Sequence, residues 1–231
     1  AWWIMAANPI YDSFFDTVPI AAEQISRLEQ ILNGSPVSHE QPLEMAMRYA
    51  LTQVQQRLNI RENDFLNRYL AAVHNAQKAE LEARLNPEKG LMKRTTSDKG
   101  GNAALLCFVP FFDGTIETAE EKAIYEFGSF SQLVDDMKDA EEDAAAGRLT
   151  LITEQFLTDE EIYTEQGRMK DALKLMNFSP ARTHRFLLIH QLYFLSGLKA
   201  KHRYDLKKGA GETLSAVSEY LIVAREVLKF T

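Results

Sequence analysis

The sequence predicts an all-α protein folded as one antiparallel helical bundle. Alternating runs of β-branched residues, which would indicate strands, are scarce, and long segments place apolar residues three and four positions apart. The 231 residues are enough for one domain with a substantial core. No repeat, low-complexity tract or interdomain linker interrupts this pattern. We therefore expect residues 1–231 to form a single helical domain.

Recognisable breaks separate the expected helices. Residues 33–36 end one helix, Ser38 is expected to cap the next, and residues 86–87 mark a loop. Residues 113–115 mark a tight connection, and residues 179–180 start a helix with Ser at the cap and Pro in the first turn. The expected helices cover about 1–16, 20–33, 38–58, 62–85, 100–112, 117–147, 158–177, 180–207 and 210–230.

The composition of the chain argues against several classes of protein. Hydrophobic residues make up 45% and charged residues 26% of the chain, as in ordinary soluble proteins, and the net charge of -7 argues against nucleic acid as a partner. Cys107 is the single cysteine, which predicts no disulfide framework and a reducing, cytoplasmic location. The apolar run 103–112 is too short to cross a bilayer, and the apolar start lacks the basic region of a signal peptide.

The most informative stretch is residues 127–147, where an apolar approach leads into several aspartates. On a helix, Asp135, Asp139 and Asp143 would share one face, where their like charges repel unless a cation binds. Mg²⁺ takes one or two carboxylates and completes its shell with water and phosphate oxygens. The alternative is a solvated acidic face. The apolar approach favours carboxylates at the mouth of a buried cavity.

These residues resemble a known motif. The pattern G-x-x-x-Q-x-x-D-D-x-x-D is similar to the second aspartate-rich motif of the trans-prenyltransferases, in the class I isoprenoid synthase superfamily. The continuation 143–149 resembles the squalene and phytoene synthases, where an Asp and a Gly-Arg follow the motif. The resemblance implies a helical bundle of the isoprenoid synthase type. The five matching residues are Gly128, Gln132, Asp135, Asp136 and Asp139.

A second acidic pair lies near the start of the chain. Asp12 and Asp16 are four residues apart and would share a helical face, which by itself is commonplace on surface helices. Together with residues 127–147, the pair resembles the first aspartate-rich motif, D-D-x-x-D, with Ser13 in place of the second Asp.

Two basic segments are candidates for anion binding. Residues 93–102 carry a basic cluster ahead of a helix whose expected start at residue 100 is Gly-rich, where ammonium groups and free N–H groups could hold an anion; a plain flexible basic loop is the alternative. Lys99-Gly100-Gly101 resembles the Lys-Thr-Gly segment of prenyltransferases. Arg203-Tyr204 resembles the diphosphate-binding pair of microbial terpene synthases. Upstream on the same expected helix, His190, Tyr193 and Phe194 are predicted to be core residues.

The resemblance implies a site that binds Mg²⁺ and, through it, a prenyl diphosphate; it is also compatible with a homodimer. Gln132 would be a polar residue near the carbocation. The implied metal ligands are Asp12, Asp16, Asp135, Asp136 and Asp139, and the implied diphosphate ligands are Arg94, Lys99, Arg203 and Tyr204.

Two segments of the chain-elongating prenyltransferases are not found in this sequence, which favours a different subclass of the superfamily. Chain-elongating prenyltransferases carry a Gly-Gly-Lys-x-x-Arg segment upstream and an Arg pair after the first motif, whereas here Arg27 is the one arginine in the segment that follows Asp16. A one-substrate, terpene synthase-like reaction is therefore the simpler prediction. A condensing prenyltransferase stays open, because upstream helices could lie outside this chain or come from a partner. A catalytically silent subunit also stays open, because Ser13 and the absent Arg pair indicate loss of part of the metal site.

Overall fold

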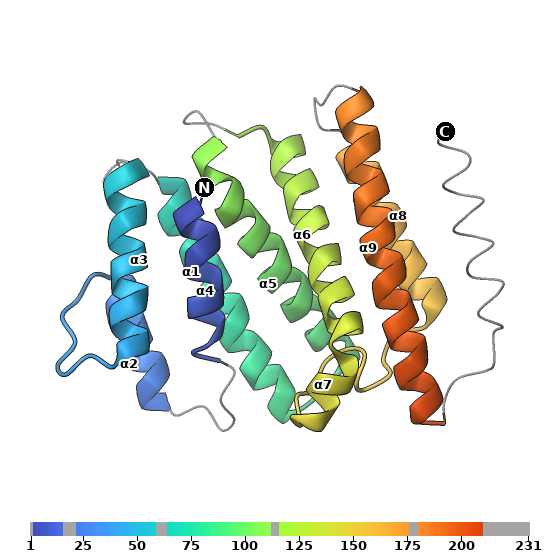
Figure 1. Cartoon of the computed structure of the whole chain (residues 1–231), viewed down its shortest axis with the longest axis horizontal. Helices are drawn as coiled ribbons and strands as arrows, with labels where there is room; N and C mark the ends of the chain where they lie inside the picture. Colours follow the sequence, from blue (N-terminus) through green and yellow to red (C-terminus); the bar gives the residue numbers. More distant parts are fainter. Residues whose placement is uncertain (1, 16–21, 59–63, 112–115, 176–179, 210–231) are drawn as a thin grey trace. The chain divides into compact units, whose positions relative to one another are not determined.

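Helices are the regular elements of this protein. The computed structural model describes residues 2–15, 22–58, 64–111, 116–175 and 180–209, and no strand occurs in these ranges (Figure 1). The all-α prediction is therefore confirmed, while the bundle type stays a prediction. Within the same ranges, no helix has the length and apolarity needed to cross a membrane. In chain order the elements are α1 (Trp2–Asp12), α2 (Ala22–Leu32), α3 (Pro42–Leu58), α4 (Asp64–Leu85), α5 (Lys89–Phe108), the 3-10 turn η2 (Val109–Phe111), α6 (Thr118–Lys138), α7 (Ala140–Ala145), α8 (Asp159–Leu173) and α9 (Pro180–Lys207).

Several predicted boundaries were wrong. Residues 93–99, predicted to precede the helix, lie inside α5, because the packing of Gly100 against Gly128 of α6 outweighs the local preference of Gly, Ser and Thr for a loop. The helix predicted from Ser38 begins at Pro42, since proline suits the first helical position, where no N–H donor is needed. The helix predicted over 117–147 is interrupted at Asp139. The helix predicted over 210–230 lies outside the described residues.

Contacts divide the chain into two compact units. Unit 1 comprises residues 1–70 and 105–116. In this unit α1 and α2 both pack on α3, and the Arg27 side chain of α2 donates two hydrogen bonds, of 2.6 and 2.7 Å, to the Glu44 carboxylate of α3. The buried apolar residues of unit 1 include Phe14, Phe15, Leu28, Ile31, Met47 and Val54.

Unit 2 comprises residues 71–104 and 117–231, and α6 is its central helix. Helices α7, α8 and α9 all contact α6, and Figure 1 shows α6 lying alongside α9. Thr158 and Glu161 form a capping box that starts α8, in which each side chain bonds the backbone N–H of the other residue. The core of this unit includes Phe130, Leu133, Val134, Met137, Leu151, Ile152, Ile162, Met169, Phe194 and Leu198.

Glycines allow α5 and α6 to approach closely. A Cβ added at Gly128 of α6 would overlap the carbonyl oxygen of Gly100 and the Cβ of Ala104, both on α5. A Cβ added at Gly100 would likewise overlap the backbone of Gly128 and the Cβ of Gln132. The two helices therefore touch backbone to backbone, which holds the Lys99-Gly100-Gly101 segment directly against the acidic motif.

Replacing Gly128 with Ala is expected to lower the free energy of unfolding by about 1–3 kcal/mol, because the added methyl group forces the two backbones apart. Chemical denaturation measures the change. Gly167→Ala is the matched control: Gly167 lies inside α8 with open space around it, so the same substitution should stabilise the protein by about 0.5–1 kcal/mol. Equal effects of the two variants would contradict the close α5–α6 contact.

Candidate functional site

The four aspartates of α6 and α7 differ in exposure. Asp135 and Asp139 are exposed, whereas Asp136 and Asp143 are only 8% and 7% exposed. The predicted single stripe of Asp135, Asp139 and Asp143 is therefore wrong for Asp143. The physical reason is that α6 ends at Lys138, and Asp139 leaves the helical conformation (φ −95°, ψ 6°) before α7 begins.

Asp135, one of the two exposed aspartates, is bonded by a side chain of α9. The hydroxyl of Tyr193 donates a hydrogen bond to Asp135, and the ammonium group of Lys138 lies 4.7 Å from the centre of the Tyr193 ring. Partial burial, together with the negative charges of Asp135 and Glu142, raises the pKa of Asp139. The like charges of Asp135 and Asp139 thus act on each other, and a bound cation would relieve that repulsion.

Asp136 is a buried carboxyl with mixed neighbours. Its Oδ1 accepts a hydrogen bond of 2.9 Å from Gln132 Nε2. Burial, reinforced by the negative charge of Glu80, raises the pKa of Asp136 to about 7, although Gln132 and Lys99 act in the opposite direction. The predicted residues Gln132, Lys99 and Asp136 are therefore brought together, from two helices.

Lys99 is already engaged in an ion pair. Its Nζ lies 3.3 Å from Glu80 Oε2, and Arg84 donates a 3.0 Å hydrogen bond to the other carboxylate oxygen of Glu80. Burial alone would raise the pKa of Glu80, but the charges of Lys99 and Arg84 outweigh it and lower that pKa. Because Lys99 lies in mid-helix, the predicted anion site at free N–H groups of a helix start is wrong; only the side-chain charge of Lys99 can serve an anion.

The turn that follows α7 places the positively charged side chain of Arg148 beside Asp143. Gly147 has a φ of +69°, a conformation that glycine adopts without strain, and the N–H of Arg148 then bonds the carbonyl of Asp143 at 2.8 Å. This geometry brings Arg148 Nε within 2.7 Å of Asp143 Oδ1. The Gly-Arg of the continuation therefore neutralises Asp143, the buried aspartate that follows the motif.

Glu80 sets the electrostatic environment of Asp136, so we expect Glu80→Gln to lower the pKa of Asp136 from its value of about 7. Titration of the aspartate carboxyl carbons by NMR measures the change. Glu126→Gln is a matched control, since Glu126 lies on α6 and its side chain pairs with Arg168 instead. An unchanged Asp136 titration in Glu80→Gln would contradict this coupling.

The other predicted site residues lie elsewhere. Arg94 is exposed on α5, and five residues of helix turn it about 140° away from Lys99. Arg203 is exposed on α9, whereas Tyr204 is 3% exposed and its hydroxyl donates a 3.2 Å hydrogen bond to the Thr153 carbonyl. Asp12 ends α1 in unit 1, and Asp16 lies outside the described residues.

The carboxylates of unit 2 could provide only some of the ligands that a hard cation needs. Within the described ranges, no three His, Cys, Asp or Glu side chains come close enough together to hold a metal ion by themselves. Asp135 and Asp139 supply the one or two carboxylates that Mg²⁺ usually takes from a protein. The donor chemistry therefore fits Mg²⁺, provided that water and a phosphate group fill the remaining positions.

Sequence reasoning missed the polar residues of α4 and the role of Tyr193. Gln77, Glu80 and Arg84 share one face of α4 and are largely buried. Gln77 Oε1 and Arg84 Nε have no hydrogen-bond partner among the described residues. A signal was available, since three polar residues spaced by three and four positions interrupt the apolar pattern of this helix.

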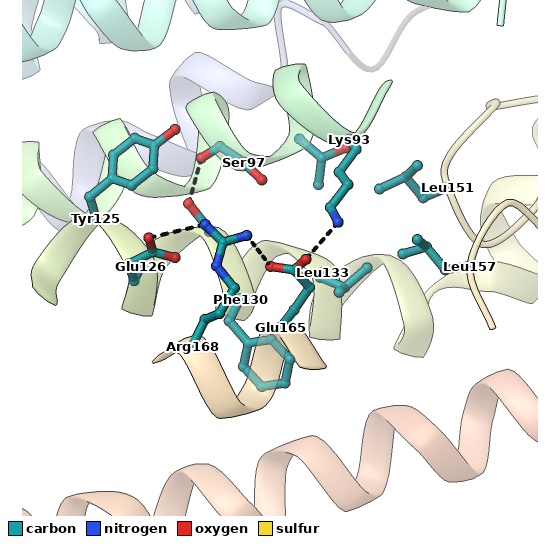
Figure 2. Close-up of a pocket in the computed structure, with 12 residues that line it drawn as sticks. Lys93, Ser97, Tyr125, Glu126, Phe130, Leu133, Leu151, Leu157, Glu165 and Arg168 are labelled. Carbon is teal, nitrogen blue, oxygen red and sulfur yellow. Dashed lines mark hydrogen bonds and ion pairs between the residues drawn. The ribbon is translucent and has the colours of Figure 1, made fainter. Parts of the chain in front are cut away.

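A cavity of about 140 Å³ lies near the acidic motif in unit 2, between α5, α6, α8 and the loop that precedes α8 (Figure 2). Phe130 and Leu133 of the apolar approach line it, but none of the motif aspartates does. The motif aspartates therefore do not stand at the mouth of this cavity, and their placement at the mouth of a buried cavity stays a prediction. Other charged residues, from α5, α6 and α8, stand there instead.

Comparisons with protein family models, with curated proteins and with solved structures found no match to this chain. The resemblance to class I isoprenoid synthases therefore rests on the residues of the two acidic motifs and the basic segments.

Proposed function

We propose that the chain is a Mg²⁺-dependent class I isoprenoid enzyme. In this proposal it ionises an allylic prenyl diphosphate, and the carbocation is cyclised or quenched as in terpene synthases. The observation that carries the proposal is the contact between two segments that resemble the same superfamily, Lys99-Gly100-Gly101 on α5 and the acidic motif on α6.

The residues of unit 2 would have separate roles in the proposed reaction. Asp135 and Asp139 would hold the cation through carboxylate oxygens. When bound, Mg²⁺ supplies positive charge that stabilises the departing diphosphate. Lys99 would add a second positive charge, and the buried Asp136, hydrogen-bonded to Gln132, would balance it. The roles that the resemblance implies for Asp12, Asp16, Arg94, Arg203 and Tyr204 stay predictions and are not part of this arrangement.

The test is an incubation with Mg²⁺ and geranyl, farnesyl or geranylgeranyl diphosphate, with and without isopentenyl diphosphate. Hydrocarbon or alcohol formed from a single substrate supports the proposal. A longer prenyl diphosphate, formed only with isopentenyl diphosphate, supports a condensing prenyltransferase instead. The matched control adds a chelator, which should abolish diphosphate release if the reaction depends on the cation.

A catalytically silent helical subunit is the second candidate. Two observations favour it. Lys99, which would bind the diphosphate, already forms an ion pair with Glu80, and Asp136, which the resemblance implies as a metal ligand, is buried. Absence of diphosphate release from every substrate, by protein whose helical circular dichroism is intact, would favour this candidate over the enzyme.

A further inference from the structure

The cavity beside α6 has one apolar wall that is already formed, while its remaining lining is polar. Phe130, Leu133, Leu151 and Leu157 line it, and each is between 2% and 5% exposed. Its volume of about 140 Å³ is close to that of an engineered apolar cavity that takes up benzene. Preformed apolar cavities with a few polar groups are the usual form of small-molecule sites.

The mouth of the cavity carries two positive and two negative side chains that are paired with one another. Glu165 lies 2.6 Å from Lys93 and 3.0 Å from Arg168, and Arg168 also lies 3.4 Å from Glu126. Figure 2 shows Arg168 reaching between the two carboxylates. The Glu126 and Glu165 side chains are only 14% and 15% exposed, so a charged ligand would have to break a pair and strand a largely buried carboxylate.

Two hydroxyl groups of the lining, on Thr96 and Ser97, are left for a ligand, and Thr96 is the more buried of the two. Thr96 is 6% exposed, and its hydroxyl makes no hydrogen bond within the described part of the chain. The neighbouring Ser129 hydroxyl is engaged, because it donates a 2.8 Å hydrogen bond to the Ser97 carbonyl. A ligand that bonds to the Thr96 hydroxyl would gain the modest net free energy of one hydrogen bond formed in place of a bond to water.

Entry to the cavity does not require the core to rearrange. The Arg168 and Lys93 side chains at the mouth are 55% and 38% exposed. Long exposed side chains change rotamer within nanoseconds, so the mouth can admit a small molecule.

We infer that this cavity binds a small uncharged molecule with a hydrocarbon body about the size of a benzene ring and one hydroxyl or carbonyl group that bonds to Thr96. The four paired charges at the mouth select against ionic ligands, and the apolar wall formed by Phe130 and the three leucines takes the hydrocarbon body. This site shares no residue with the carboxylates proposed to hold Mg²⁺, so it does not depend on the proposed function.

The test uses phenol and benzene as probes of the full chain, followed by NMR of ¹³C-labelled leucine methyl groups and by calorimetry. Phenol should bind saturably and shift the methyl signals of Leu133, Leu151 and Leu157. Thr96→Val keeps the side-chain shape without the hydroxyl, and should weaken phenol binding about two- to twelve-fold while leaving benzene binding unchanged.

Two control variants keep the result interpretable. Thr96→Ser retains the hydroxyl and should restore phenol binding. Thr164→Val makes the same change at an exposed site on α8 and should leave binding unaltered. The inference is overturned if neither probe shifts the three leucines up to its solubility limit, or if Thr96→Val binds phenol as tightly as the unaltered chain. Tighter binding of benzoate or benzylammonium than of phenol would also overturn it.

Discussion

Replacing Asp135 with Asn is expected to lower the rate of diphosphate release from an allylic prenyl diphosphate by about 10²–10³-fold, as when one preorganised electrostatic group is removed from an active site. Asn keeps the shape of the side chain but removes the negative charge that would hold Mg²⁺ beside Asp139. Asp135 is exposed, so the loss should come from the site rather than from unfolding. Steady-state release of diphosphate at several Mg²⁺ concentrations measures the effect.

The matched control is Asp171→Asn. Asp171 is an aspartate of α8 whose side chain is 76% exposed and pairs with Lys174, outside the acidic motif. Its substitution should leave the rate unchanged. Because Asp135→Asn weakens metal binding, a higher Mg²⁺ concentration should restore part of the activity. If Asp135→Asn released diphosphate as fast as Asp171→Asn, Asp135 would not be a metal ligand.

Asp136→Asn is expected to raise the free energy of unfolding at pH 8 by up to about 4 kcal/mol when divalent cations are absent. Burial raises the pKa of Asp136 to about 7, from the ordinary aspartate value of 3.8. Between these two pH values the folded chain binds more protons than the unfolded chain, so this residue lowers stability as pH rises from about 4 to about 7. Each unit of pKa difference is worth about 1.4 kcal/mol.

Asn cannot ionise, so the variant should lose this fall in stability. Urea denaturation of both proteins at pH 4, 6 and 8 measures it as a difference that is near zero at pH 4 and largest at pH 8. Asp171→Asn, the same substitution at an exposed site, should show no such pH dependence. A constant difference across the three pH values would mean that Asp136 ionises as an ordinary surface aspartate.

The sequence was sufficient to predict the helical class, because the three- and four-residue apolar spacing is a local property of the chain. It also predicted most helix positions and the turn at Gly34, whose φ is +73°. It misplaced the start of α5, because the packing of Gly100 against Gly128 joins residues far apart in the chain. Local glycine content indicated a loop there, and tertiary contact made it a helix.

For the candidate site too, the sequence predicted some features and only the tertiary structure decided others. The spacing of like charges along a helix singled out Asp135 and Asp139, and the resemblance to the superfamily motifs added Asp136 and Lys99. Only the tertiary structure decided that Asp136 is buried, that Lys99 pairs with Glu80, and that Tyr193 bonds to Asp135. Burial and ion pairing depend on which helices meet, and a pattern along a single helix does not contain that information.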